Sequence, residues 1–334
     1  MQEISVFWFR RDLRSFDNTG LYYALRSDQP VLPIFIFDKA ILDDLEDKSD
    51  PRVSFIHNRI TQLADQFRKA GSAIEVFYGT PHDAFKKLCS EYKVNEVYAN
   101  RDYEPYAKER DSQIDELLKS RGAKLLTFKD QVILEQQEIL NGSGEVNKVF
   151  TPFKNKWLDK FKAQQLSHHP SEEHLDQLLK TSPSDIPSLE QMDFSRSDVP
   201  IPIDEYPTGI IKKYDEQRNF PAIEGTSRLG IHFRFGTVSI REAVQTAFKL
   251  NGTWLNELIW REFYQMILAN FPHVVDKAFK PQYDHVPWRN DAEQFDRWCH
   301  GKTGYPIVDA GMRELNATGH MHNRVRMITA SFLT

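Results

Sequence analysis

The sequence predicts an α/β domain with a doubly wound, five-stranded parallel sheet, followed by an all-α domain. Its 334 residues are enough for about two domains. Over the first 130 residues short apolar segments alternate with amphipathic ones, whereas from residue 208 onward the apolar residues follow a helical period. A polar stretch that contains prolines lies between them. We therefore expect an α/β domain at 1–130, a connector at 131–207 and a helical domain at 208–334.

Five short apolar segments in the first domain are expected to be buried parallel strands. They are rich in β-branched and aromatic residues and apolar on both faces, as in strands that helices cover from both sides. They occupy residues 4–9, 31–37, 73–78, 96–99 and 124–128. Helical patterns occupy residues 18–27, 52–70, 81–92 and 104–121. This repeated strand–helix order favours a Rossmann-like sheet with right-handed crossovers.

Two common nucleotide-binding motifs are absent or incomplete. The loop after the first expected strand, FRRDLRSFDN, lacks the G-x-G-x-x-G pattern that binds dinucleotides. Gly301-Lys302-Thr303 matches the end of a phosphate-binding loop, but Asp296 stands where the full pattern has its first glycine. A loop-to-helix turn is the favoured interpretation of this segment.

Capping signals indicate where helices of the second domain begin and end. Asn256 can cap a helix over Glu257–Ala269. Tyr305-Pro306 can open another helix that ends at Gly319, and a last helix is expected to begin near His320.

The charge is slightly acidic and unevenly distributed. With 43 Lys and Arg against 48 Asp and Glu, the net charge is −5, which excludes a chain coated with basic charge for non-specific nucleic-acid binding. Residues 201–334 hold 16 basic and 15 acidic residues, and ten of the basic ones are arginines. Four of the six tryptophans also lie there. Arg and Trp suit phosphate binding with base stacking, and the alternative is a Trp-rich core under a solvated Arg surface.

The remaining composition bears on the cellular compartment. Cys89 and Cys299 are too few for a disulfide framework or a Cys-rich zinc site, so we expect a reducing cytoplasm, such as the bacterial cytosol, and no metal. The sequence has no run of about 18 apolar residues, so no transmembrane helix is expected. The first residues do not resemble a signal peptide.

One turn and one helix stripe could form a binding site. The segment Gly225-Thr226-Ser227-Arg228-Leu229-Gly230 can offer N–H groups, hydroxyls and a guanidinium to a phosphate, although Thr-Ser before a helix is also an N-cap signal. One stripe of the following helix carries, at i, i+3, i+4 and i+7, the residues Glu257, Trp260, Arg261 and Tyr264. The stripe is either a wall that stacks a flat ring or a Glu–Arg surface pair beside core aromatics.

The last expected helix carries two stripes. The apolar stripe consists of Met321, Val325, Ile328 and Phe332. The second stripe consists of Asn323, Arg326, Met327 and Ala330, and Arg324 lies beside it. Asn and Arg next to a core stripe need partners if they are buried. They either stay at the surface or line a polar pocket, and the resemblance that follows favours the pocket.

The chain closely resembles the DNA photolyase/cryptochrome superfamily in four segments that occur in the family's order. These are FWFRRDLRSFDN, EGTSRLGIHFRFGTVS, NELIWREFYQMIL and WCHGKTGYPIVDAGMRELNATGHMHNRVRMITASFLT. It is most similar to class I cyclobutane pyrimidine dimer (deoxyribodipyrimidine) photolyases of bacterial type. The resemblance implies an α/β domain that can hold an antenna pigment and a helical domain that binds FAD.

The resemblance also implies roles for individual residues. FAD would be contacted by Tyr214, Thr226, Ser227, Arg228, Leu229, Gly230, Trp254, Arg261 and Arg326. Dimer-containing DNA would be contacted by Arg218, Glu257, Trp260, Arg261, Tyr264, Asn323 and Arg324. The catalytic pocket would comprise Glu257, Trp260, Asn323 and Met327. Trp288 would be the surface member of an electron-transfer chain to the flavin.

The implied activity is light-driven repair by electron transfer from reduced FAD, in a monomeric enzyme. Asn323, Met327 and Trp260 favour dimer repair over the six-four photolyase and plant cryptochrome branches. A cryptochrome-like photoreceptor without repair is the alternative, and so is an inactive truncated product.

The chain departs from the family pattern in three places. Gly230 stands where a serine is usual, so one hydroxyl contact to phosphate is expected to be lost. Tyr106 and Ala107 do not match the residue pair that grips a folate antenna, which leaves a folate or a deazaflavin pigment open. The resemblance also implies that the chain ends inside the FAD domain, after Thr334.

Overall fold

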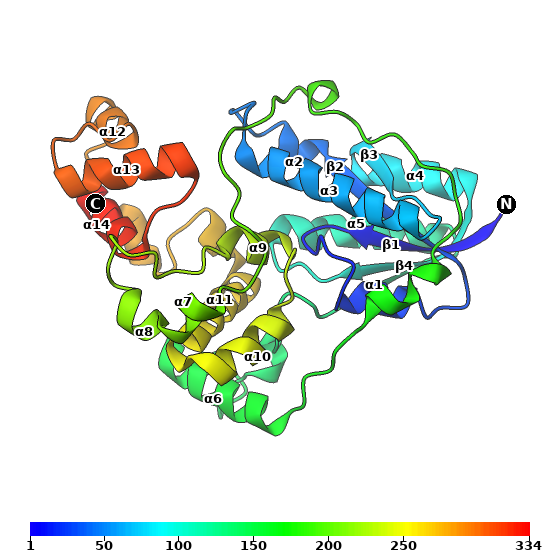
Figure 1. Cartoon of the computed structure of the whole chain (residues 1–334), viewed down its shortest axis with the longest axis horizontal. Coiled ribbons are helices and arrows are strands. Elements are labelled where there is room, and N and C mark those ends of the chain that lie inside the picture. Colours follow the sequence, from blue (N-terminus) through cyan, green and yellow to red (C-terminus); the bar gives the residue numbers. More distant parts are fainter.

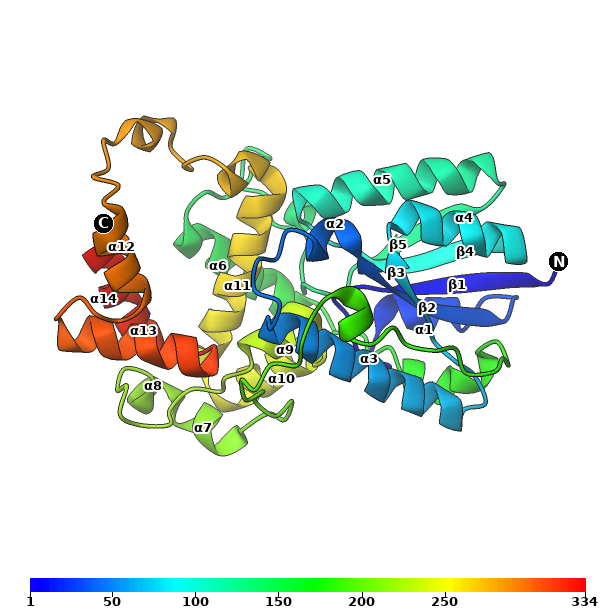
Figure 2. The same ribbon diagram turned by 90° about the horizontal axis from the view of Figure 1, so that it is seen from above.

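A computed structural model describes all 334 residues and shows an α/β part and a helical part side by side (Figures 1 and 2). The sheet of the α/β part has five parallel strands in the order β3-β2-β1-β4-β5. The strands are β1 (Glu3–Phe9), β2 (Val31–Asp38), β3 (Glu75–Gly79), β4 (Lys93–Asn100) and β5 (Lys124–Phe128). Ser5 of β1 pairs with Val31 on one side and with Glu96 on the other, which puts the switch in strand order between β1 and β4. The predicted doubly wound sheet is confirmed.

Helices cover both faces of the sheet because alternate side chains of each strand point to opposite faces. Phe7 and Phe9 of β1 share one core with α1 (Thr19–Ala24) and α3 (Pro51–Lys69). Val6 and Trp8 share the other core with α4 (Pro81–Glu91) and α5 (Pro105–Ser120). The short helix α2 (Lys39–Leu42) follows β2 directly. Helices α3, α4 and α5 each begin with proline. Proline has no N–H, and at the first position of a helix none is needed, because an N–H there has no acceptor within the helix.

The segment expected to be a connector packs against both parts of the molecule. After η1 (Gln136–Glu138), helix α6 (Phe150–Ala163) buries Trp157 in the core of the helical part. The chain then returns over the sheet through η2 (Ser171–Gln177) and η3 (Glu190–Met192), and Leu178 pairs with Val31 in an isolated β-bridge. The boundaries at 130 and 207 stay predictions.

The helical part is built around one large core and one small one. Its helices are α7 (Thr208–Lys212), α8 (Tyr214–Gln217), α9 (Gly230–Phe235), α10 (Ile240–Leu250), α11 (Gly252–Asn270), α12 (Ala292–Cys299), α13 (Pro306–Thr318) and α14 (Asn323–Leu333). Two 3-10 segments, η4 (Pro272–Val275) and η5 (Pro281–His285), follow α11. Helices α6, α10 and α11 supply most of the large core. The small core consists of Met312, Met321 and Val325 from α13, the turn before α14, and α14.

The helix ends correct two predictions. Asn256 does not cap α11, because the helix begins at Gly252 and the Asn251 side chain accepts the N–H groups of Thr253 and Trp254, at 2.9 and 3.1 Å. Helix α14 begins at Asn323, with His322 as its N-cap, three residues after the expected start. The expected start of α13 at Pro306 and its end before Gly319 are confirmed. None of the helices is long and apolar enough to cross a membrane.

Candidate functional site

A cavity of about 540 Å³ lies between α11, the α8–α9 region and two loops of the α/β part. Seven of its lining residues are among those singled out from the sequence: Tyr214, Ser227, Gly230, Trp254, Glu257, Arg261 and Tyr264. The α/β part contributes Arg11, Asp102, Tyr103 and Glu104. The cavity therefore brings together aromatic faces, a hydroxyl and charges of both signs, which suits a flat ligand with an anionic part.

One stripe of α11 forms a wall of the cavity. Trp254, Glu257, Arg261 and Tyr264 follow one another at spacings of three, four and three residues, so they lie on the same side of the helix. The Asn251 cap fixes where the helix starts, and the packing of its apolar side into the large core orients the stripe. Trp254 is almost fully buried, whereas Tyr264 keeps 62% of its surface exposed. The stripe thus runs from the core toward solvent.

Glu257 is paired with Arg218 rather than with Arg261. The Arg218 guanidinium donates to the Glu257 carboxylate and lies over the Tyr214 ring, 5.6 Å from its centroid. Burial raises the pKa of the Tyr214 phenol, and the charge of Glu257 adds to the effect. The prediction of a surface pair between Glu257 and Arg261 is therefore wrong. Both partners of the observed pair keep part of their surface in solvent, so a ligand can reach them.

Arg261 is held by backbone carbonyls. Its Nη1 donates to the Gln131 carbonyl at 2.7 Å and its Nη2 to the Phe233 carbonyl at 3.1 Å. Burial lowers the pKa of Arg261 to about 10, so the side chain is still cationic at neutral pH. It therefore supplies a fixed positive charge at the cavity wall.

The turn before α9 has the close contacts of a shaped binding loop. A side chain at Gly225 would lie 2.9 Å from the backbone of Gln217. Arg228 has a φ of 52°, a conformation that costs a non-glycine residue about 1–3 kcal/mol. Helix α9 has Leu229 as its N-cap and no side-chain cap, so Ser227 is not used to cap it. Ser227 lines the cavity instead.

Trp260 lies beside the cavity in a row of aromatic rings. The Phe150 ring stacks on its indole with centroids 3.5 Å apart and planes 7° apart, and the Tyr264 ring lies 5.5 Å away at 25°. Phe150 therefore covers one face of Trp260.

Several candidate residues do not line the cavity. These are Thr226, Arg228, Leu229, Arg218, Trp260, Trp288, Asn323, Arg324, Arg326 and Met327. Met327 and Trp288 are more than half exposed. Arg324 reaches toward the site through Asn219, whose side-chain oxygen accepts from its Nε at 2.9 Å. In the apolar stripe of α14, Val325 is buried, whereas Ile328 and Phe332 are exposed.

Sequence reasoning missed the residues that the α/β part supplies. The Glu104 carboxylate accepts from Arg11 Nη1 and from Arg234 Nη1 of α9, each at 2.5 Å. Burial disfavours the charged form of Glu104, but the two arginines outweigh burial and lower its pKa. Arg11 follows β1 and Glu104 follows β4, and the carboxyl ends of these two strands are neighbours at the point where the strand order switches. That position is the usual ligand site of such sheets and was the available signal.

The Glu262 carboxylate, also missed, ties α11 to the segment after β5 and to α6. It accepts the N–H groups of Ile133 and Leu134 at 2.7 and 2.8 Å, and the Trp157 Nε1 at 2.6 Å. Burial raises the pKa of Glu262 to about 7, against the opposing effect of these donors. The pair Arg261–Glu262 thus points one charge to the cavity and the other into the core.

Comparison with known families assigns the chain. The family model of DNA photolyase matches residues 5–174, and that of the FAD binding domain of DNA photolyase matches residues 254–334. A deoxyribodipyrimidine photo-lyase from Synechococcus is 35% identical over 98% of this chain and 73% of its own length. The chain belongs to the DNA photolyase family. Its match to the FAD binding domain begins at Trp254, a cavity residue.

Solved photolyase structures share the fold. An archaeal photolyase from Sulfolobus tokodaii, described as containing two FAD molecules, aligns with a TM-score of 0.78 at 32% identity, over 99% of this chain and 74% of that one. A bacterial class III photolyase from Agrobacterium tumefaciens aligns with a TM-score of 0.82 at 27% identity, over 100% of this chain and 73% of that one. This member of the photolyase family thus spans about three quarters of the length of these relatives.

Proposed function

We propose that this photolyase repairs cyclobutane pyrimidine dimers in DNA, using blue light and reduced FAD. The observation that carries the proposal is the α11 stripe of Trp254, Glu257 and Arg261. It lines the cavity of about 540 Å³ and lies within the segment that matches the FAD binding domain of DNA photolyase. Relatives at 33–35% identity are named deoxyribodipyrimidine photo-lyase.

The residues of the cavity fit FAD. Tyr214 and Trp254 offer aromatic faces for a flat ring system, and Arg261 offers a buried positive charge. Ser227 and the turn that ends at Gly230 offer a hydroxyl and backbone groups to phosphates. Bound in its reduced form, FAD would supply the photoexcited electron that splits the dimer.

The residues at the outer end of the cavity fit the DNA lesion. Photolyases take the damaged bases out of the helix, which requires aromatic faces for stacking and polar groups for the base edges. The largely exposed ring of Tyr264 and the indole of Trp260 beside it would supply the stacking surface. Glu257, oriented by Arg218, would hydrogen-bond the edge of the dimer and stabilise the charge that develops on it. From α14, Asn323, Arg324 and Met327 would approach through the Asn219 contact.

A repair assay tests the proposal. The purified chain is loaded with FAD, reduced, mixed with an oligonucleotide containing one thymine dimer, and exposed to blue light. Repair restores the pyrimidine absorbance of the oligonucleotide, and a dark sample is the control. Repair in the light supports the proposal, and no repair with bound, reduced FAD contradicts it. A light-induced change of the flavin without repair would instead indicate a photoreceptor.

A further inference from the structure

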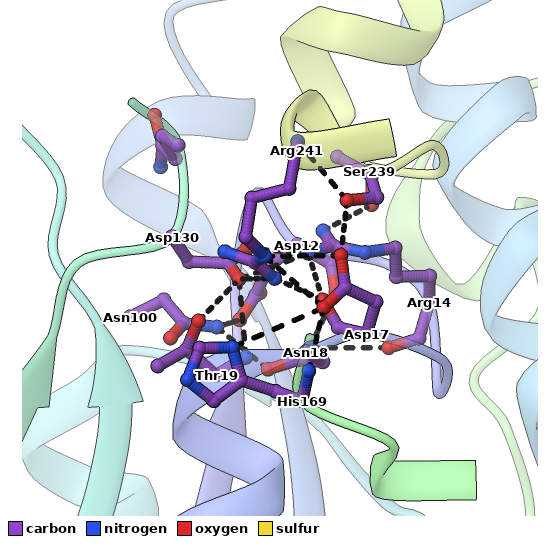
Figure 3. A network of polar contacts seen from close by, with 12 residues as sticks. Asp12, Arg14, Asp17, Asn18, Thr19, Asn100, Asp130, His169, Ser239 and Arg241 are labelled. Carbon is purple, nitrogen blue, oxygen red and sulfur yellow. Dashed lines mark hydrogen bonds and ion pairs between the residues drawn. The ribbon is translucent and has the colours of Figure 1, made fainter. Parts of the chain in front are cut away.

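A buried cluster of charges joins the α/β part to the helical part (Figure 3). Arg241, in the first turn of α10, places its Nε 3.0 Å from both carboxylate oxygens of Asp17. Its Nη2 lies 3.0 Å from Asp130 and also donates to the Asp17 carbonyl. Arg14 binds Asp130 from the other side, at 2.8 and 2.9 Å. The four side chains are at most 9% exposed.

The cluster is balanced in charge and fixes the start of α10. Two arginines face two aspartates, so neither sign is left in excess among the four side chains. The Ser239 hydroxyl donates to the Asp17 carboxylate and accepts the N–H groups that begin α10. One aspartate after β1 thereby holds both the guanidinium of Arg241 and the N-cap of its helix.

At the same junction, the backbone of the loop after β1 is in close contact with the turn between α9 and α10. The Leu13 N–H donates to the Phe235 carbonyl at 2.9 Å, and Arg14 Nη1 donates to the Gly236 carbonyl at 3.0 Å. Gly236 has a φ of 62°, and a side chain there would lie 2.4 Å from the Arg11 carbonyl. The turn between α9 and α10 therefore lies directly on the loop after β1.

Arg11 of that loop contacts the loop after β4, and together the two loops form the α/β wall of the cavity. Arg11 and Arg234 grip one oxygen of Glu104, and Tyr103 and Asp102 lie next to it. The only covalent connection between this wall and α11 is the long stretch of chain that includes the connector 131–207. The position of the wall is fixed by the contacts of the α/β part with the turn between α9 and α10, together with the hydrogen bonds from Lys108 to the Ala269 carbonyl and from Arg261 to the Gln131 carbonyl.

We propose that Arg241 is a positioning residue for the cofactor cavity. By binding Asp17 and Asp130, it seats the α/β part so that Arg11, Tyr103 and Glu104 close one side of the cavity. This inference rests on the proposed function, since it assigns FAD to the cavity. A preformed wall lowers the cost of ordering the site on binding, so the junction sets part of the affinity for FAD.

The variant Arg241→Lys tests this positioning. It keeps the positive charge but cannot hold two carboxylates in one planar fork. The matched control is Arg297→Lys, which weakens the exposed pair with Glu293 in α12. One readout is amide hydrogen exchange of residues 102–104 in the chain without FAD. The other is the dissociation constant for FAD, measured by flavin fluorescence under conditions where circular dichroism shows each variant folded.

We expect Arg241→Lys to speed exchange at 102–104 and to weaken FAD binding by about tenfold, and the control to change neither. We also expect Glu104→Gln to weaken FAD binding in the parent chain but to add little to Arg241→Lys, because both act through the same wall. Unchanged exchange at 102–104 in a folded Arg241→Lys variant, or full additivity with Glu104→Gln, would overturn the proposal.

Two further arms keep the test decisive. If Arg241→Lys does not fold, Asp17→Asn replaces it, because the amide keeps the shape of the partner and removes its charge; the same outcomes apply. If the parent chain binds no FAD, the proposed function fails. The exchange readout still shows whether Arg241 seats the wall, so the two failures are distinguishable.

Discussion

An Arg–Asp cluster at the junction of the two parts and the Arg218–Glu257 pair at the cavity use the same types of charge in different surroundings. At the junction, Arg241 and Asp17 are almost fully buried and every contact is made within the chain. At the cavity, Arg218 and Glu257 form the same kind of pair with side chains 27% and 39% exposed. Burial makes the first pair part of the fold, whereas exposure leaves the second pair open to a ligand.

The physical basis of the difference is solvation. A buried charge that loses its partner has no water to replace it, whereas a half-exposed charge is resolvated at small cost. The two regions should therefore respond differently to the same substitution.

The largest expected effect is at the junction. Arg241→Met leaves the Asp17 and Asp130 carboxylates buried without their shared partner, and the free energy of unfolding should fall by about 3–5 kcal/mol. Arg218→Met, at the exposed pair, should lower it by about 0–1 kcal/mol. Urea unfolding followed by circular dichroism measures both. Equal losses would remove the distinction between the two regions.

The next effect concerns Glu262, which is buried like the junction but next to the cavity. Glu262→Gln turns an amide donor toward the N–H groups of Ile133 or Leu134, and one unsatisfied donor should cost about 1–3 kcal/mol. Urea unfolding at neutral pH measures this loss. A smaller loss than that of Arg218→Met would contradict it.

The same variant has a pH signature. The pKa of Glu262 is raised from 4.5 to about 7 in the folded chain, so between these values the folded state binds more protons than the unfolded state. Its contribution to stability is therefore full at low pH and is lost as the pH rises through about 7. The stability difference between the parent chain and Glu262→Gln should shrink over that interval and level off above it. A difference that grows with pH would mean that the three donors lower the pKa instead.

These contrasts also mark what the sequence could and could not predict. The order of strands and helices follows from short apolar segments between amphipathic ones, the start of α13 from Pro306, and the α11 stripe from the helical period, and the structure confirms them. Asn251 and Asn256 are both of a residue type that caps helices, and the structure uses Asn251, which brings Trp254 into the first turn of α11 and into the large core.

The junction was out of reach because its partners are far apart in the chain. Asp17 and Arg241 are separated by 224 positions, and nothing near either residue marks the other. Likewise, the expected connector 131–207 contains α6, whose Trp157 packs in the large core and donates its N–H to Glu262, 105 positions away. Single-sequence patterns reveal which face of an element is apolar, but not which distant charge it meets.

Beside the cavity, Trp260→Ala should weaken binding to dimer-containing DNA by about 1–3 kcal/mol, the usual value of one base stack. Because Phe150 covers one face of the indole, Phe150→Leu should loosen Trp260 and give a smaller loss of the same sign. Fluorescence anisotropy with damaged and undamaged oligonucleotides measures the preference. An unchanged preference in Trp260→Ala would exclude Trp260 from the lesion pocket.

The smallest expected effect is at Glu257 and is the most specific test of the comparison. Glu257→Gln keeps the shape and a hydrogen bond to Arg218 but removes the charge, and because the pair is partly exposed, stability should change by at most about 1 kcal/mol. If Glu257 orients the dimer edge, repair per absorbed photon should nevertheless fall roughly fivefold, or about 1 kcal/mol. Binding of undamaged DNA is the control and should not change. A variant that loses stability and repair together would place Glu257 with the junction residues, as part of the fold, whereas loss of repair alone would assign it to the site.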